Sequence, residues 1–207
     1  MMALKRMLLI AVFSVLHSVA FAQEDSTTAV NEIYDFRRQL DSDYQNPKES
    51  PLGVKEIESF GGHTYFPIDL NYRVTAKVEV LKNEKVFQMK TTTDRKPDYI
   101  KALKLSFRIQ DSICVLYAYR NIALTQKPEY KDQLFLPFTD PTNGFESYGG
   151  GRYIDLKMTD KETMVVDFNQ SYNPYCAYSG KYSCPVPPKE NALRVKINAG
   201  ILAPPAH

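Results

Sequence analysis

The sequence predicts a mainly β protein, an antiparallel β-barrel or sandwich of about eight strands preceded by one N-terminal α-helix. Two observations favour this class. Apolar and polar residues alternate with a period of two through much of the chain after residue 70, and turn-forming residues recur at short intervals. No helical period separates the predicted strands, which argues against a parallel α/β sheet.

The one long helix is predicted over residues 28–44. Ile33 and Leu40 fall near one face of a 3.6-residue period, and a hydroxyl side chain at Thr28 can cap the first turn. Pro47 follows and ends the helix, because proline lacks the N–H that a helix needs. A short helical turn is expected over residues 54–60.

Strands are predicted where apolar residues alternate with polar ones. The clearest covers residues 72–80, and residues 103–109 and 113–119 form a hairpin across Gln110-Asp111. The remaining strands are expected at residues 85–92, 134–138, 152–157, 163–168 and 193–197.

The first residues indicate export. Lys5 and Arg6 precede an apolar run over residues 7–19, and Ala20-Phe21-Ala22 provides a small-x-small cleavage signal. The run of about 13 residues is short of the roughly 20 that span a bilayer. We therefore expect a signal peptide over residues 1–22, cleavage after Ala22, and a single periplasmic or secreted domain over residues 23–207 without a stable membrane anchor.

Charge and composition exclude several classes of partner. The 26 basic and 24 acidic residues become 24 and 24 once Lys5 and Arg6 are removed, so the mature chain has no formal net charge. This balance argues against nucleic acid or an anionic membrane as a partner. Three histidines and three cysteines without zinc-type spacing predict no metal and no cofactor.

A glycine bend with an adjacent arginine is the sharpest indication of a binding site. Three consecutive glycines allow positive φ angles, successive amides can bind an anion, and Arg152 offers a planar pair of donors. The alternative is a tight bend or bulge in which Arg152 pairs with Asp140, Glu146 or Asp167. The candidate ligand-binding residues are Tyr148, Gly149, Gly150, Gly151, Arg152, Tyr153, Asn173 and Tyr175.

A loop rich in tyrosine follows over residues 169–191, and we expect it to lie against the glycine bend. In an exported protein its Cys176 and Cys184 can form a disulfide, although two reduced thiols or a redox pair remain alternatives. Only Lys181 and Lys189 lie close in sequence, so nothing here indicates a lowered thiolate pKa. His63 is expected to be a partly exposed loop residue rather than a base.

Three runs carry a family resemblance. They read Y-F-P-I-D-L-N-Y-R-V-T-A-K-V (65–78), L-F-L-P-F-T-D-P-T-N-G-F-E-S-Y-G-G-G-R-Y-I-D-L (134–156) and V-D-F-N-Q-S-Y-N-P-Y-C-A-Y-S-G-K-Y-S-C-P-V-P-P-K-E-N-A-L (166–193). They resemble the hallmarks of a bacterial family catalogued as domain of unknown function 1684. The resemblance implies a single-domain bacterial protein without an assigned activity, so it transfers no catalytic residue.

Function is therefore inferred from the residues alone. The leading hypothesis is a pocket at the glycine bend for a small polar or anionic ligand, with Arg152 as the anchor. One alternative is a hydrolase using carboxylates from Glu146, Asp155, Asp167 and Glu190, which requires two of them to converge in one pocket. Another is a structural or interaction domain of the cell envelope, which a large exposed apolar patch would favour.

Overall fold

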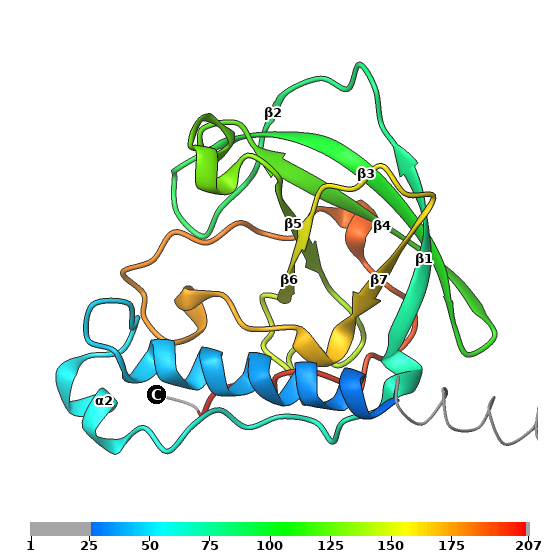
Figure 1. Ribbon diagram of the computed structural model, residues 1–207. Coiled ribbons are helices and arrows are strands. Elements are labelled where there is room, and N and C mark those ends of the chain that lie inside the picture. Colours follow the sequence, from blue (N-terminus) through cyan, green and yellow to red (C-terminus); the bar gives the residue numbers. More distant parts are fainter. Residues whose placement is uncertain (1–25, 206–207) are drawn as a thin grey trace, which may run out of the picture.

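The structure is a computed structural model that describes residues 26–205 (Figure 1). The N-terminal helix spans residues 26–45, which confirms the predicted helix, and lies alongside a curled β-sheet. A short helix, α2 (Val54–Ser59), follows it. The predicted signal peptide lies outside the described residues. Within residues 26–205, no helix is long and apolar enough to cross a membrane.

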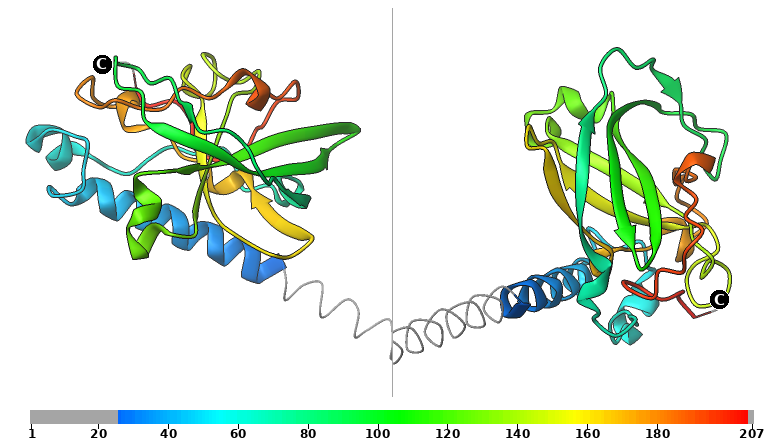
Figure 2. Two further views of the ribbon diagram at one scale, coloured as in Figure 1. Left: turned by 90° about the horizontal axis from the view of Figure 1, so that it is seen from above. Right: turned by 90° about the vertical axis from the view of Figure 1, so that its right-hand side faces the viewer.

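Seven antiparallel strands form one sheet, which curls into a half-barrel (Figures 1 and 2). Its order is β6-β5-β4-β3-β1-β7, and β2 pairs with β3 off this path. The mainly β prediction is confirmed. The strands are β1 (Arg73–Val80), β2 (Phe87–Gln88), β3 (Asp98–Ile109), β4 (Ser112–Asn121), β5 (Gln133–Phe138), β6 (Arg152–Lys157) and β7 (Thr163–Asp167).

The hairpin of β3 and β4 has the predicted turn, in which Gln110 takes a φ of 52°. Both strands are longer than predicted. The register shifts between Lys101 and Leu103, so that Ala102 and Leu103 are both buried. This bulge interrupts the alternation of apolar and polar residues, and therefore hides the first part of β3 from a period-two pattern.

The two faces of the sheet are packed differently. Leu105, Leu116 and Leu136 belong to the principal hydrophobic core on one face. Since side chains alternate along a strand, the opposite face of β4, β5 and β6 carries Tyr119, Phe135 and Asp155, which are register neighbours across the three strands. This second face carries the candidate site described below.

Two strand predictions need correction. Within residues 85–92 only Phe87 and Gln88 form a strand, and Thr91 makes an isolated bridge with Pro185. Residues 193–197 do not form a strand, so the sheet has seven of the roughly eight predicted strands. Leu193 and Ile197 still pack into the principal core. The alternation of apolar and polar residues in this segment therefore reflects burial and not strand pairing. The backbone near Ile197 is hydrogen-bonded by side chains instead of by a neighbouring strand.

Those side chains form a buried ion pair. Arg152 and Asp140 are both fully buried in their side chains, and Nη2 of Arg152 lies 2.8 Å from Oδ1 of Asp140. Arg152 also donates to the carbonyl oxygens of Ile197 (2.9 Å) and Ala199 (2.5 Å), and Asp140 accepts from the amide of Ile197 (2.8 Å). These hydrogen bonds offset the desolvation of two charges. The pair thus holds β6, the turn after β5 and the C-terminal segment together.

Replacing Arg152 with Met is expected to lower the free energy of unfolding by about 3–5 kcal/mol, because the Asp140 carboxylate would remain buried without its counter-charge. Arg38→Met is the control, since Arg38 forms an exposed ion pair with Asp35 that contributes little. Urea unfolding followed by circular dichroism measures both variants. If both variants lose the same free energy of unfolding, the buried ion pair contributes no more to stability than the exposed one.

Candidate functional site

The glycine bend and the tyrosine-rich loop lie against each other, as expected. Tyr153 and Tyr172 exchange two backbone hydrogen bonds of 2.9 Å each. The hydroxyl of Tyr148 lies 3.9 Å from the sulfur of Cys176, and the hydroxyl of Tyr153 donates to the carbonyl oxygen of Pro185. The two segments therefore form one continuous wall.

The bend itself is closely packed. Gly151 has a φ of 91°, and a Cβ atom there would lie 2.7 Å from the carbonyl oxygen of Phe138 and from Cγ of Pro187. Only glycine fits this position without strain. A Cβ at Gly150 would meet the ring of Tyr148, whereas one at Gly149 would have ordinary contacts with Gly144. The glycines thus allow close internal packing.

Arg152 and Asn173 both have internal roles. The guanidinium of Arg152 is fully buried beside Asp140. Asp140 is one of the three partners named for Arg152 if the glycines form a tight bend or bulge instead of a binding site. Asn173 is buried and donates to the hydroxyl of Tyr178 (3.2 Å) and the carbonyl oxygen of Leu202 (2.8 Å). Neither residue is among those that line the cleft next to the bend.

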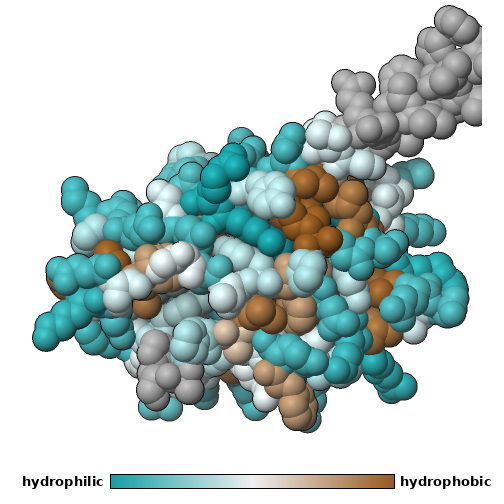
Figure 3. Space-filling view, turned by 90° about the horizontal axis from the view of Figure 1, so that it is seen from below, coloured by the Kyte–Doolittle hydropathy of each residue, from teal (hydrophilic) through white to brown (hydrophobic). Residues whose placement is uncertain are grey.

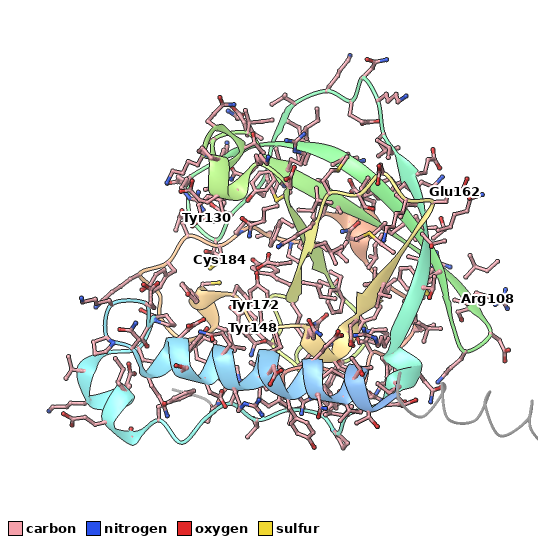
Figure 4. The ribbon with its side chains drawn as sticks, viewed as in Figure 1. Arg108, Tyr130, Tyr148, Glu162, Tyr172 and Cys184 are labelled. Atoms are coloured by element: carbon pink, nitrogen blue, oxygen red, sulfur yellow. The ribbon has the colours of Figure 1, made fainter. Side chains whose placement is uncertain are left out.

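A cleft of about 500 Å³ lies next to the bend, over the second face of the sheet. Figure 4 labels three of its lining residues, Tyr130, Tyr172 and Cys184, which come from segments far apart in the sequence. Two of the predicted ligand-binding residues, Tyr153 and Tyr175, line the cleft. The lining residues are Phe36, Gln39, Leu40, Asp43, Tyr99, Tyr119, Asn121, Leu124, Thr125, Tyr130, Gln133, Phe135, Tyr153, Asp155, Tyr172, Pro174, Tyr175, Tyr182, Ser183, Cys184 and Pro185.

Aromatic rings dominate the walls of the cleft. Seven of the chain's fourteen tyrosines line it, together with two phenylalanines. The rings hold one another edge to face: Phe135 and Tyr153 are 4.6 Å apart, and Tyr153 and Tyr172 are 5.8 Å apart between ring centroids. Edge-to-face contacts fix ring orientations, so the cleft is largely preformed.

The charges of the cleft are all negative. Asp43 and Asp155 line it, and none of the described lining residues is Lys, Arg or His. Asp155 is open to the cleft but has protein on most sides, and this burial raises the pKa of its carboxyl group. Hydrogen bonds from Tyr172 and Gln133 act in the opposite direction, because they stabilise the carboxylate. Burial also raises the pKa of Tyr172 well above its usual value.

The other three carboxylates of the hydrolase alternative form ion pairs outside the cleft. Glu146 lies 3.1 Å from Lys196, Asp167 lies 2.8 Å from Arg73, and Glu190 lies 3.0 Å from Lys101. None of the three lines the cleft beside Asp155. The geometry therefore lacks the converging pair of carboxylates that this alternative requires.

Cys176 and Cys184 are adjacent free thiols. The backbone N–H of Cys176 donates to the sulfur of Cys184 over 3.1 Å. A hydrogen bond from the Cys184 thiol lowers the pKa of Cys176 to about 6, and sharing that proton raises the pKa of Cys184. The expectation that nothing lowers a thiolate pKa is thus wrong. The donors are the side chains of Cys184, Tyr148 and Thr92 rather than nearby lysines, and no local pattern in the sequence reveals them.

His63, which the sequence predicted to be a partly exposed loop residue, has a buried side chain. Its side chain is only 3% exposed, and its Nδ1 lies 2.6 Å from Oδ1 of Asp41 on the N-terminal helix. Tyr44, Phe60 and Tyr178 surround the ring, with centroids 4.3–5.6 Å away. Burial lowers the pKa of His63, although its hydrogen bond to Asp41 opposes that shift. It lines a separate cavity of about 350 Å³ near the C-terminal segment.

Two further features bear on function. Among residues 26–205, no group of three or more metal-binding side chains is arranged to hold an ion. On the face seen in Figure 3, hydrophobic residues form separate small patches among hydrophilic ones. Large exposed apolar side chains such as Phe145, Ile113 and Val54 come from different parts of the chain. This face does not present the large continuous apolar patch that would favour an envelope-docking domain.

The fold and site define a half-barrel β domain with an aromatic cleft on the outer side of its sheet. The chain belongs to the family described as a protein of unknown function (DUF1684), whose model matches residues 58–201. It is similar to the uncharacterized protein from gene locus rrnAC0354 of Haloarcula marismortui, which was solved by solution NMR. The two are 33% identical, the match covers 89% of this chain and 99% of that one, and the TM-score is 0.70. No curated protein matches the chain.

His63 is expected to make the fold less stable as the pH falls. Its pKa is lowered in the folded state, so the unfolded chain takes up a proton first, near pH 6.5. Stability is complete above this pH and declines below it, with a slope of at most about 1.4 kcal/mol per pH unit. Urea unfolding at several pH values between 5 and 7.5 measures the slope.

The matched variant is His63→Phe, which keeps an aromatic ring in the same surroundings but cannot titrate. It should unfold with a flatter pH dependence than the wild-type chain over this range. An identical slope in both proteins would show that His63 is not the titrating group.

Proposed function

We propose that this protein is an exported β domain that binds a small polar ligand in the tyrosine-lined cleft. The observation that carries this proposal is a preformed cavity of about 500 Å³ whose apolar aromatic walls contain a few polar groups, led by Asp155 and Tyr172. Cavities of this size and character are typical of small-molecule sites. The cleft adjoins the glycine bend through Tyr153, so the site lies next to the predicted one.

The proposed ligand is not an anion. The charged groups lining the cleft are Asp43 and Asp155, which would repel a carboxylate or phosphate. The arginine next to the bend is buried on the other side of β6, against Asp140. The site therefore favours a neutral or positively charged polar ligand.

Export and a disulfide form the second part of the proposal. The N-terminal signal sequence supports delivery to the periplasm or to the outside of the cell. Such a compartment is oxidising, and the contact between Cys176 and Cys184 supports a bond between them there. The bond would close a short loop in one wall of the cleft and add about 2–3 kcal/mol of stability.

Ligand binding is tested by thermal-shift screening of polar metabolites, followed by titration calorimetry of the compounds that respond. Tyr175→Ala is expected to weaken binding roughly 3- to 10-fold, because it removes one aromatic wall of the cleft. Tyr34→Ala is the control, since Tyr34 is an exposed tyrosine of the N-terminal helix outside the cleft. The proposal fails if no compound responds, or if both variants bind with unchanged affinity.

The disulfide is tested on protein purified without reductant from the compartment to which cells export it. Denaturation with iodoacetamide should alkylate only Cys114, and intact mass spectrometry counts the labels. Prior reduction should raise the count from one to three, as expected from the three free cysteines in the structure. Three labels without reduction would contradict the disulfide.

A further inference from the structure

Asp155 has unused acceptor capacity facing the cleft. It stands on β6 opposite Phe135 of β5, on the face that the cleft covers. Its protein donors are the side chains of Tyr172 and Gln133. A carboxylate offers about four lone-pair positions, so two donors leave room for a ligand that also donates hydrogen bonds.

Gln133 supplies a second and independent indication. It lines the same cleft, and hydrogen bonding from its side chain counteracts the effect of burial on the pKa of Asp155. Its carbonyl oxygen Oε1 is buried and has no hydrogen-bond partner. A buried acceptor without a partner is unfavourable, and a ligand N–H placed next to Asp155 would satisfy it.

The surrounding rings favour a positive charge in the same place. Phe135, Tyr153 and Tyr172 lie close to one another around this part of the wall. Aromatic faces attract cations through their quadrupole, and more strongly where water is excluded. Asp43 contributes further negative charge from the N-terminal helix, and no basic side chain among the described lining residues competes with a bound cation.

We propose that the cleft binds a protonated amine with an aromatic or apolar body, its ammonium group lying between Asp155 and Oε1 of Gln133. The body of the ligand packs against the tyrosine rings. This assignment rests on the proposed small-ligand function and names the chemical class of the ligand. A neutral hydroxyl in the same place loses the charge-assisted hydrogen bond, and a carboxylate meets Asp155 as a like charge.

Three probes with the same body and different head groups test the assignment. They are 2-phenylethylamine, 2-phenylethanol and phenylacetate, titrated at pH 7.5 into the ¹⁵N-labelled mature chain and followed by its amide signals. The amine should bind at least about tenfold more tightly than the alcohol, since a hydrogen bond to a charged group contributes more than a neutral one. Phenylacetate should bind most weakly.

Asp155→Asn is the informative variant, because it keeps the size and the acceptor oxygen while removing the charge. In this variant 2-phenylethylamine should no longer bind more tightly than 2-phenylethanol, and the affinity for 2-phenylethanol should be unchanged. Glu79→Gln is the matched control, since Glu79 pairs with Lys104 at the surface and lies outside the cleft. If Asp155→Asn does not fold, the order of the three probes on the wild-type chain decides.

Each outcome separates the two proposals. Similar affinities for all three probes, or tighter binding of phenylacetate, would overturn the amine assignment and leave the small-ligand function intact. The amine assignment is also overturned, and the small-ligand function remains, if metabolite screening finds a cleft ligand while none of the three probes shifts the amide signals. If neither screening nor the probes give any binding, both proposals fail.

Discussion

The buried ion pair of Arg152 and Asp140 is the constraint on which the rest of the structure depends. Its desolvation is compensated only if the C-terminal segment brings the carbonyl oxygens of Ile197 and Ala199 to the guanidinium. Because side chains alternate along β6, an arginine that points into the core places Tyr153 and Asp155 on the opposite face. The same residue that organises the interior therefore orients two walls of the cleft.

Much of the architecture follows from periodicity in the sequence. The N-terminal helix and β1 were predictable because apolar and polar residues repeat regularly along most of each element. The site was predictable in part, because tyrosines and glycines in residues 148–182 mark a segment that is ordered rather than solvated. The sequence indicated Tyr153 and Tyr175, and both line the cleft.

The remaining features depend on partners that are distant in sequence. Asp140 was one of three acidic partners considered for Arg152, but no local pattern selects it or shows that the pair is buried. No local pattern shows that His63 meets Asp41 among aromatic rings from three segments. The lowered pKa of Cys176 has the same origin, since it depends on the position of a second thiol across a turn. Asp155 was identified as a possible catalytic carboxylate, but only the structure shows that it faces a cleft together with Tyr172 and Gln133.

One wall of the cleft lies outside the part of the chain that the family model matches. Phe36 and Asp43 lie on the helix of residues 26–45, whereas the family match begins at residue 58. The sheet and the tyrosine-rich loop supply a scaffold that relatives can inherit unchanged. Under the ligand-binding proposal, selectivity can then diverge through substitutions on a single helical face, so that two members with nearly superimposable barrels would recognise different compounds.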